Sequence, residues 1–290
     1  MTKHGSVWIA VLVAAVGLGA TGPRCDASRT ESLRALDTGM QHYRSGRHTA
    51  ALRSFREAVQ VDESNDPAHY YLALLSFHQF HDENTAEKHF RRALDLNAGE
   101  PEYHYQYGAL LQDAGKSEEA LPYLQHAIDK RPDHFHAWYR LGQVRHAQGR
   151  MKDAVDAWTR SINFDPRFAR PFIELGGLYL DFGHAREAAQ VLRNCTENVA
   201  ADPECHNELG RALQVQGDPE GAIAAFNRAL SIKPDFAGAL FNVGVAYRDT
   251  GNARKAVFYL KRYLAHADRK AEATRVTAAE QVIAGLDSTP

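Results

Sequence analysis

The sequence lacks an excess of charge of either sign. Its 290 residues carry 34 basic and 36 acidic side chains, for a formal net charge of −2 at pH 7. This balance gives no electrostatic footprint for nucleic acid, and no long polybasic run is present for an anionic membrane surface. With 44% hydrophobic and 24% charged residues, the chain has the composition of a folded globular protein.

Cysteines and catalytic motifs are also scarce. Only three cysteines occur, without a CxxC pair or a Cys/His spacing typical of zinc. The 15 histidines are scattered and form no HExxH-like set. There is no GxSxG motif, P-loop or dinucleotide-binding fingerprint. We therefore predict that the protein is not an enzyme, with no catalytic residues, no cofactor and no bound metal.

Long hydrophobic runs are absent except near the beginning of the chain. A short basic start precedes an apolar run at residues 7–20, and small residues follow it. This order is typical of a secretory signal peptide, cleaved after Ala20 or Ala27. The alternative is an uncleaved membrane anchor, although the run is shorter than the about 20 residues that a membrane span needs. We predict an exported protein, periplasmic or secreted, in which residues 1–31 are the signal or anchor and a short tether.

What the sequence has in abundance is internal repetition with a period of 34 residues. One glycine row, in which Leu74 replaces the second member, is Gly39, Gly108, Gly142, Gly176, Gly210 and Gly244. A second glycine row, with His81 as its exception, is Gly46, Gly115, Gly149, Gly183, Gly217 and Gly251. The alanine row is Ala51, Ala86, Ala120, Ala154, Ala188, Ala222 and Ala256. A bulky row four residues further on is Phe55, Phe90, Leu124, Trp158, Leu192, Phe226 and Leu260.

The unit that begins at Phe135 shows what each row does. Trp138, Leu141 and Gly142 share one face of a helix, and the missing side chain of Gly142 lets a neighbouring helix approach closely. Gly149 ends this helix, because glycine readily takes the left-handed conformation of a C-terminal cap. A second helix follows, with a small alanine and a bulky residue on its inward face. The repeat therefore predicts pairs of helices.

This pattern resembles the tetratricopeptide repeat family. The period and the motif W-x-x-L-G, then G, then A-x-x-x-W, then P in Trp138–Pro166 carry the resemblance. The family implies an all-α fold, a right-handed superhelical α-solenoid of antiparallel helix pairs. It also implies a concave surface lined by the first helix of each pair, where a protein or peptide partner binds.

We divide the repeat region, residues 32–270, into seven units. Residues 271–286 follow as a C-terminal capping helix, and residues 287–290 form a tail. The units are 32–65, 67–100, 101–134, 135–168, 169–202, 203–236 and 237–270.

The resemblance places a candidate partner-binding groove on the first helices. Tyr71, Tyr105 and Tyr139 recur at a spacing of 34 residues and offer rigid contact area, although tyrosine at this position also packs between repeats in the family. The full set of candidate groove residues is Tyr71, Leu75, His78, Tyr105, Gln112, Tyr139, Arg140, His146, Arg170, Asn207, Arg211, Phe241, Asn242 and Arg248. Because His78, His136 and His146 lie there, we expect binding to weaken below about pH 6.5, the unperturbed pKa of histidine.

Lysine is missing from every predicted first helix. Members of the family that capture the C-terminal carboxylate of chaperones use a clamp of lysine and asparagine on successive first helices. Such a clamp cannot be assembled here, although Asn207 and Asn242 could hydrogen-bond a ligand backbone. The predicted arginines could pair with acidic groups of a ligand, but pairing with nearby carboxylates of the chain is the simpler expectation.

Cys195 and Cys205 lie on either side of one predicted turn. Cys195 ends a second helix and Cys205 begins the next first helix, so both should lie at a similar level. Export to an oxidising compartment would allow them to form a disulfide. Two free thiols remain the alternative.

Three functions fit these features. The first is an exported scaffold or adaptor that holds a partner peptide or helix in its groove, for the assembly of an envelope or secretion complex. The second is a non-catalytic subunit of an envelope enzyme complex, such as one that builds or modifies polysaccharide. The third, a cytosolic co-chaperone, is opposed by the N-terminal segment and by the missing lysine clamp. We expect no nucleic-acid partner, and contact with a membrane only if the N-terminal segment is uncleaved.

Overall fold

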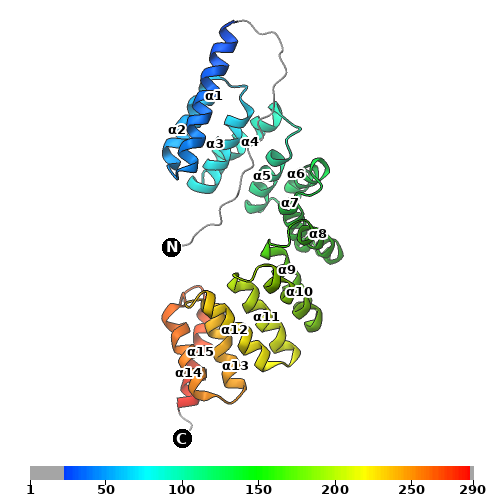
Figure 1. Ribbon diagram of the computed structural model, residues 1–290, viewed down its shortest axis with the longest axis vertical. Helices are drawn as coiled ribbons and strands as arrows, with labels where there is room; N and C mark the ends of the chain where they lie inside the picture. Colours follow the sequence, from blue (N-terminus) through cyan, green and yellow to red (C-terminus); the bar gives the residue numbers. More distant parts are fainter. Residues whose placement is uncertain (1–22, 288–290) are drawn as a thin grey trace. The chain divides into compact units, whose positions relative to one another are not determined.

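A computed structural model describes residues 23–287, and these residues form helices joined by short turns (Figure 1). They include no β-strand, so the predicted all-α class and the α-solenoid of helix pairs are confirmed. The helices are α1 (Pro23–Arg44), α2 (His48–Val61), α3 (Asp66–Phe80), α4 (Glu83–Leu96), α5 (Pro101–Asp113), α6 (Ser117–Lys130), α7 (Phe135–Ala147), α8 (Met151–Phe164), α9 (Ala169–Asp181), α10 (Ala185–Asn198), α11 (Pro203–Gln216), α12 (Pro219–Ile232), α13 (Ala237–Asp249), α14 (Ala253–His266) and α15 (Ala273–Asp287).

The chain divides into two compact units. The N-terminal unit ends at Asn97 and contains α1 to α4, and the C-terminal unit begins at Ala98 and contains α5 to α15. Within each unit, every odd-numbered helix up to α13 packs against the even-numbered helix that follows it. In the C-terminal unit, first helices of successive pairs also touch, as α9 does with α11 and α11 with α13.

The beginning of the described chain differs from the prediction. Residues 23–31, expected to be a tether, are helical and belong to α1. Ser32 is fully buried and its hydroxyl donates a 2.7 Å hydrogen bond to the carbonyl of Ala58, which ties α1 to α2. The apolar run at residues 7–20 lies outside the described residues. No helix between residues 23 and 287 combines the length and the apolar character needed to cross a membrane.

The first helix of each repeat ends where the second glycine row predicts. All six glycines of that row have a positive φ, from 72° at Gly46 to 88° at Gly217. The exception in the sequence, His81, adopts the same left-handed region with φ 53°. The left-handed turn is therefore retained in the second repeat, residues 67–100, although its glycine is not.

The alanine and bulky rows form the core of every helix pair. All seven alanines of the row are fully buried, and the bulky residues are at most 1% exposed. The first glycine row explains how they fit: a Cβ atom built on Gly142 would lie 2.4 Å from two atoms of the Trp158 indole. The same juxtaposition joins Gly176 to Leu192 and Gly210 to Phe226. The close approach predicted for this row therefore occurs inside each pair, with the bulky side chain of the second helix lying over the glycine.

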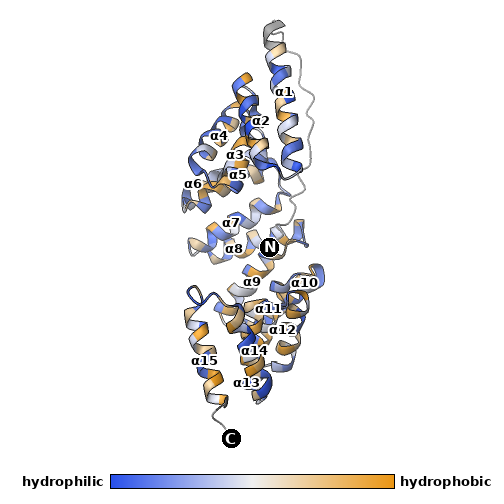
Figure 2. Cartoon of the chain, turned by 90° about the vertical axis from the view of Figure 1, so that its left-hand side faces the viewer, coloured by the Kyte–Doolittle hydropathy of each residue, from blue (hydrophilic) through white to orange (hydrophobic). Residues whose placement is uncertain are grey.

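Helix α15 completes the C-terminal unit. It packs on α14, and its Val276 and Ala279 join the core that continues from the preceding pairs. Polar and apolar residues are mixed along the helices, as expected for amphipathic helices that bury one face (Figure 2).

Candidate functional site

All the predicted groove residues lie on first helices, but they belong to two units. Tyr71, Leu75 and His78 lie on α3 of the N-terminal unit. The other candidates lie on α5, α7, α9, α11 and α13 of the C-terminal unit. We call the surface formed by the latter side chains the first-helix face.

The three candidates of the N-terminal unit differ in exposure. Tyr71 stacks on Phe55, with ring centroids 5.6 Å apart, and His78 is exposed. Leu75 is only 1% exposed and belongs to the hydrophobic core around Phe55 and Leu72. Its assignment as a groove residue is therefore wrong. Leu75 lies one helical turn after the partly exposed Tyr71, but it falls on the buried side together with Leu74 and Ser76.

The first-helix face begins with a half-buried carboxylate on α5. Glu102 accepts a 2.9 Å hydrogen bond from Arg131 and another 2.9 Å bond from Gln106. His134 caps α7 through its Nδ1 atom, which accepts from the amide of Ala137, so its proton lies on Nε2, 3.5 Å from Glu102. Burial alone would raise the pKa of Glu102, but the bonds from His134, Gln106 and Arg131 outweigh it and hold that pKa at about 2.

Tyr105 lies between histidines and an arginine. Its ring is 4.6 Å from that of His134 and stacks on His136 at 6.0 Å. Arg140 makes a two-pronged contact with Asp113, with N–O distances of 2.5 and 3.2 Å. Burial would lower the pKa of Arg140, but its bond to Asp113 raises it. This arginine is therefore paired within the chain, as expected.

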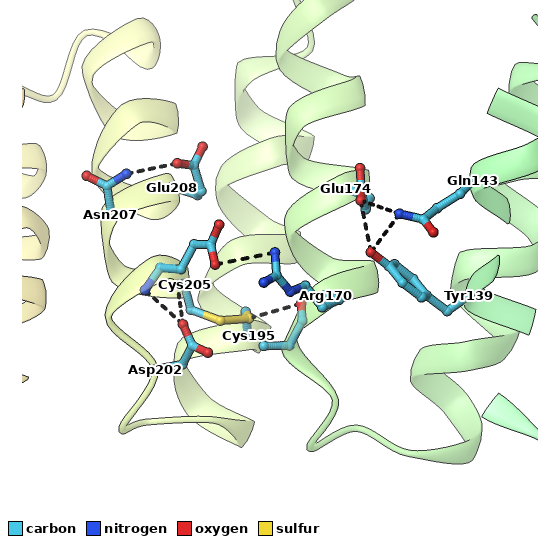
Figure 3. Close-up of polar contacts among 11 residues, drawn as sticks. Tyr139, Gln143, Arg170, Glu174, Cys195, Asp202, Cys205, Asn207 and Glu208 are labelled. Atoms are coloured by element: carbon cyan, nitrogen blue, oxygen red, sulfur yellow. Dashed lines mark hydrogen bonds and ion pairs between the residues drawn. A yellow bond between two sulfur atoms is a disulfide. The ribbon is translucent and has the colours of Figure 1, made fainter. Parts of the chain in front are cut away.

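A polar cluster then joins α7 to α9 (Figure 3). The Tyr139 hydroxyl donates to Glu174 at 3.1 Å, and the Gln143 amide donates to that hydroxyl at 2.8 Å and to Glu174 at 3.2 Å. Gln112 of α5 donates to Gln143 at 3.4 Å, which extends the contact to a third helix. Burial and the neighbouring Glu174 carboxylate raise the pKa of Tyr139, so it remains a neutral donor.

The contacts continue from α9 to α13. Arg170 lies 3.6 Å from Glu204, whose pKa is raised by burial despite this arginine. Asn207, only 5% exposed, donates to Glu208 at 2.8 Å (Figure 3). Its side-chain oxygen accepts from Asn242 at 2.9 Å. Arg211 pairs with Glu208 one turn away, as its spacing allows. Successive first helices are thus linked by amide and carboxylate groups.

A hollow of about 320 Å³ opens at this end of the first-helix face. Its lining joins α11 and α13 to the beginning of α15, and consists of Glu204, Asn207, Glu208, Arg211, Phe236, Ala237, Gly238, Asn242, Glu272 and Arg275. The Arg275 guanidinium lies 5.9 Å from the Phe241 ring, which also contacts Tyr263 at 5.2 Å. Phe241 is therefore partly covered by the capping helix.

Two candidates lie away from this network. His146 is half-buried, with its ring 5.5 Å from the Trp158 indole. Arg248 is exposed and pairs with its neighbour Asp249 at 2.7 Å. Sequence reasoning missed Glu272 and Arg275, because residues 271–286 were considered only as a cap. Their i, i+3 spacing, which places both on one face of a helix, is the signal that could have drawn attention to them.

A disulfide joins Cys195 of α10 to Cys205 of α11, with Cα atoms 5.8 Å apart. Figure 3 shows the bond between the two cysteines, and both are fully buried beside Phe172. Cys205 is also fixed by its amide, which donates to the N-cap Asp202 at 3.0 Å. The bond therefore fixes the turn directly before Glu204 and Asn207.

Within residues 23–287, no three His, Cys, Asp or Glu side chains gather in a way that could hold a metal ion. The first-helix face offers hydrogen-bond donors, acceptors and charges that are already paired with one another. Such a surface can exchange these contacts for contacts with a ligand.

Acid is expected to destabilise the C-terminal unit below the ordinary histidine pKa. Burial, together with the neighbouring His134, lowers the pKa of His136 to about 4. The unfolded chain therefore binds a proton at this residue from about pH 6.5 downwards while the folded chain does not, so stability falls as the pH falls towards 4. Urea unfolding at neutral pH and near the pKa of His136 measures this loss, and His136→Gln should reduce it. An equal loss in the variant would contradict the assignment of this loss to His136.

The expectation that His136 weakens binding below about pH 6.5 is wrong, because this imidazole stays neutral there in the folded protein.

Comparison with known proteins agrees with the fold. A family model described as "Tetratricopeptide repeat" matches residues 36–101 and 105–166, and one described as "TPR repeat" matches residues 210–251. Together they cover more than half of the chain, which belongs to the tetratricopeptide repeat (TPR) proteins.

Among curated proteins, the chain is 28% identical over 153 residues to the probable UDP-N-acetylglucosamine–peptide N-acetylglucosaminyltransferase SPINDLY of Hordeum vulgare. This match covers 49% of the chain but only 16% of that relative, so the chain spans about a sixth of its length.

Solved structures show the same fold. PilW, a type IV pilus biogenesis factor, is 20% identical with a TM-score of 0.62, over 70% of this chain and 94% of PilW. YrrB, a TPR protein with an unusual peptide-binding site, is 22% identical with a TM-score of 0.51, over 66% of this chain and 97% of YrrB.

Proposed function

We propose that the protein is an exported scaffold that binds an extended segment of a partner protein on its first-helix face. TPR proteins bind peptides or proteins, and the similar YrrB is described as having a peptide-binding site. The similar PilW is described as a type IV pilus biogenesis factor, which supports a role in envelope assembly. The seven-unit division given above and export through the N-terminal segment are part of this proposal, as is a role in assembling an envelope or secretion complex.

The observation that carries the proposal is the hollow beside Asn207 and Asn242. A primary amide has two donor hydrogens and an acceptor oxygen, which matches the alternating N–H and C=O groups of an extended backbone. Asn242 uses one donor on Asn207, so its oxygen can accept from a ligand amide. Arg211 lines the same hollow and can reach a ligand carboxylate or carbonyl.

A photo-crosslinking amino acid at position 242 tests this assignment. In the protein expressed in its native cells, we expect it to capture a discrete partner, whereas the same group at Arg228, exposed on the second helix α12, captures none. Asn242→Ala should weaken binding of the identified partner about tenfold, because it removes a hydrogen bond in a partly buried site. Arg228→Ala, which removes an exposed charge on α12, outside the first-helix face, should leave it nearly unchanged. Equal crosslinking from both positions would contradict a first-helix site.

A second function is favoured by the relationship to a transferase. The SPINDLY relative shares TPR repeats with this chain and is named as a glycosyltransferase. The chain would then be a non-catalytic subunit of an envelope enzyme complex. This alternative predicts that an enzyme co-purifies with the protein whether or not Asn242 is replaced. A cytosolic co-chaperone remains the least favoured function, because the described first helices contain no lysine.

A further inference from the structure

Helix α14 differs in charge from every other second helix of the chain. Its 14 residues include Arg254, Lys255, Lys261 and Arg262 and no acidic residue. Each of the other six second helices carries at least one carboxylate. Because the four cations lie at i−4, i−3, i+3 and i+4 around position 258, they share one face of the helix. The sequence showed no polybasic run, since the cations are separated by the helical period.

An exposed aromatic residue lies at the centre of this face. Phe258 is 56% exposed, on the side opposite the buried Ala256, Leu260 and Tyr263. At the same repeat position, the other second helices carry Arg53, Lys88, Pro122, Asp156, Gln190 and Ala224, all exposed. This position faces outwards in every repeat, and only here is it a large apolar side chain.

Two of these cations, Lys255 and Arg262, are held by contacts that do not neutralise their charge. The Arg262 guanidinium lies 5.7 Å from the Phe258 ring and donates to the carbonyl of Pro234 at 2.7 Å. The Lys255 ammonium lies 4.9 Å above the Tyr247 ring. Aromatic rings and a carbonyl orient a cation without neutralising it, so the face presents positive charge around an apolar centre.

We propose that this α14 face, defined by Arg254, Lys255, Phe258, Lys261 and Arg262, docks the protein on an anionic phospholipid surface. Lys and Arg side chains on an amphipathic helix bind anionic headgroups, and an aromatic side chain among them inserts at the boundary of headgroups and acyl chains. An acidic peptide fits less well, because an outward helix face has its backbone groups paired within the helix and cannot bond an extended strand. Double-stranded nucleic acid fits less well, because its phosphate backbone offers Phe258 no apolar layer to enter.

Vesicle co-sedimentation of the full chain tests the proposal. The probes are vesicles of phosphatidylcholine alone and vesicles of phosphatidylcholine and phosphatidylglycerol in equal parts, each at low and high salt. The apolar run at residues 7–20 can insert into either bilayer, so the measured quantity is the ratio of affinities for the anionic and the neutral vesicles. We expect this ratio to exceed one clearly at low salt and to fall with added salt.

Substitutions then assign the effect to α14. R254Q/K255Q should reduce the ratio about twenty-fivefold, since each cation near an anionic surface contributes about fivefold. Phe258→Ser should reduce affinity for the anionic vesicles about tenfold. The matched control is R53Q/R56Q, which removes two exposed arginines from α2 at the repeat positions of Phe258 and Lys261 and should change neither quantity.

Three results would overturn the proposal. The first is an affinity ratio of one for the unaltered protein. The second is an equal loss in R254Q/K255Q and R53Q/R56Q, which would indicate a general effect of charge. The third combines two observations: polyglutamate at equal charge concentration displaces the protein from the vesicles, and Phe258→Ser binds the vesicles as well as the unaltered protein does. Together they would identify an acidic protein surface as the occupant.

Discussion

Gly142→Ala is expected to lower the free energy of unfolding of the C-terminal unit by about 3 kcal/mol. The new Cβ atom would lie 2.4 Å from two atoms of the Trp158 indole, which is 1% exposed and cannot move aside. The indole N–H also donates to the carbonyl of Tyr139 at 3.2 Å, and this bond would be distorted as well. Urea unfolding followed by circular dichroism measures the loss, and hydrogen exchange of the α7 and α8 amides assigns it to this pair.

The control for this change is Gly177→Ala. Gly177 lies in α9, directly after Gly176 of the first glycine row, and a Cβ atom built on it meets nothing within 4 Å. The same substitution should therefore stabilise the protein by up to about 1 kcal/mol, because alanine is the better helix former. If both variants lost the same stability, the close contact between Gly142 and Trp158 would not be the cause.

Removing the disulfide is expected to have an effect of similar size. Cys195 and Cys205 close a short loop, with a sequence separation of 10, and a link of this kind contributes about 3 kcal/mol through the restricted unfolded chain. The double variant C195A/C205A should lose this contribution and become insensitive to reductant. Unaltered protein should lose the same amount when reductant is added.

Counting thiols provides an independent check on the disulfide. Denatured under non-reducing conditions, the protein should react at no more than one of its three cysteines, since only Cys25 lies outside the bond. Reaction at both Cys195 and Cys205 would show that they are free thiols. The unfolding measurement would then be expected to show no effect of reductant.

Much of the fold could be predicted from the sequence because small residues have few other uses in a helix. A glycine recurring in a helix interior requires a close neighbour, and Trp158 over Gly142 is that neighbour. The left-handed turn at His81 was harder to predict, because the side chain there gives no such signal. The helical start of α1 was not predicted, because residues 23–31 precede the first repeat and carry no repeat signature.

The candidate site was predictable in position but not in detail. Repeat spacing placed every candidate on a first helix, since each helix repeats the same register. It could not separate the buried Leu75 from Tyr71 and His78 on the same helix, because burial on a helix with apolar residues on several sides depends on how the next pair packs. Pairing across helices, as between Tyr139 and Glu174, depends on the distance between helices and not on spacing within one. The part played by α15 was not predicted, because α15 has no equivalent in the preceding repeats with which to compare it.

The pairing of Asn207 with both Glu208 and Asn242 has a consequence for recognition. An incoming chain must displace bonds that already exist, so the enthalpy gained is the difference between two similar sets of bonds. A ligand with every donor and acceptor in register replaces each hydrogen bond that it breaks. A ligand that lacks a single group leaves a polar atom of the hollow without a hydrogen-bond partner. Such exchange yields modest affinity, rapid release and sharp discrimination between near-identical ligands.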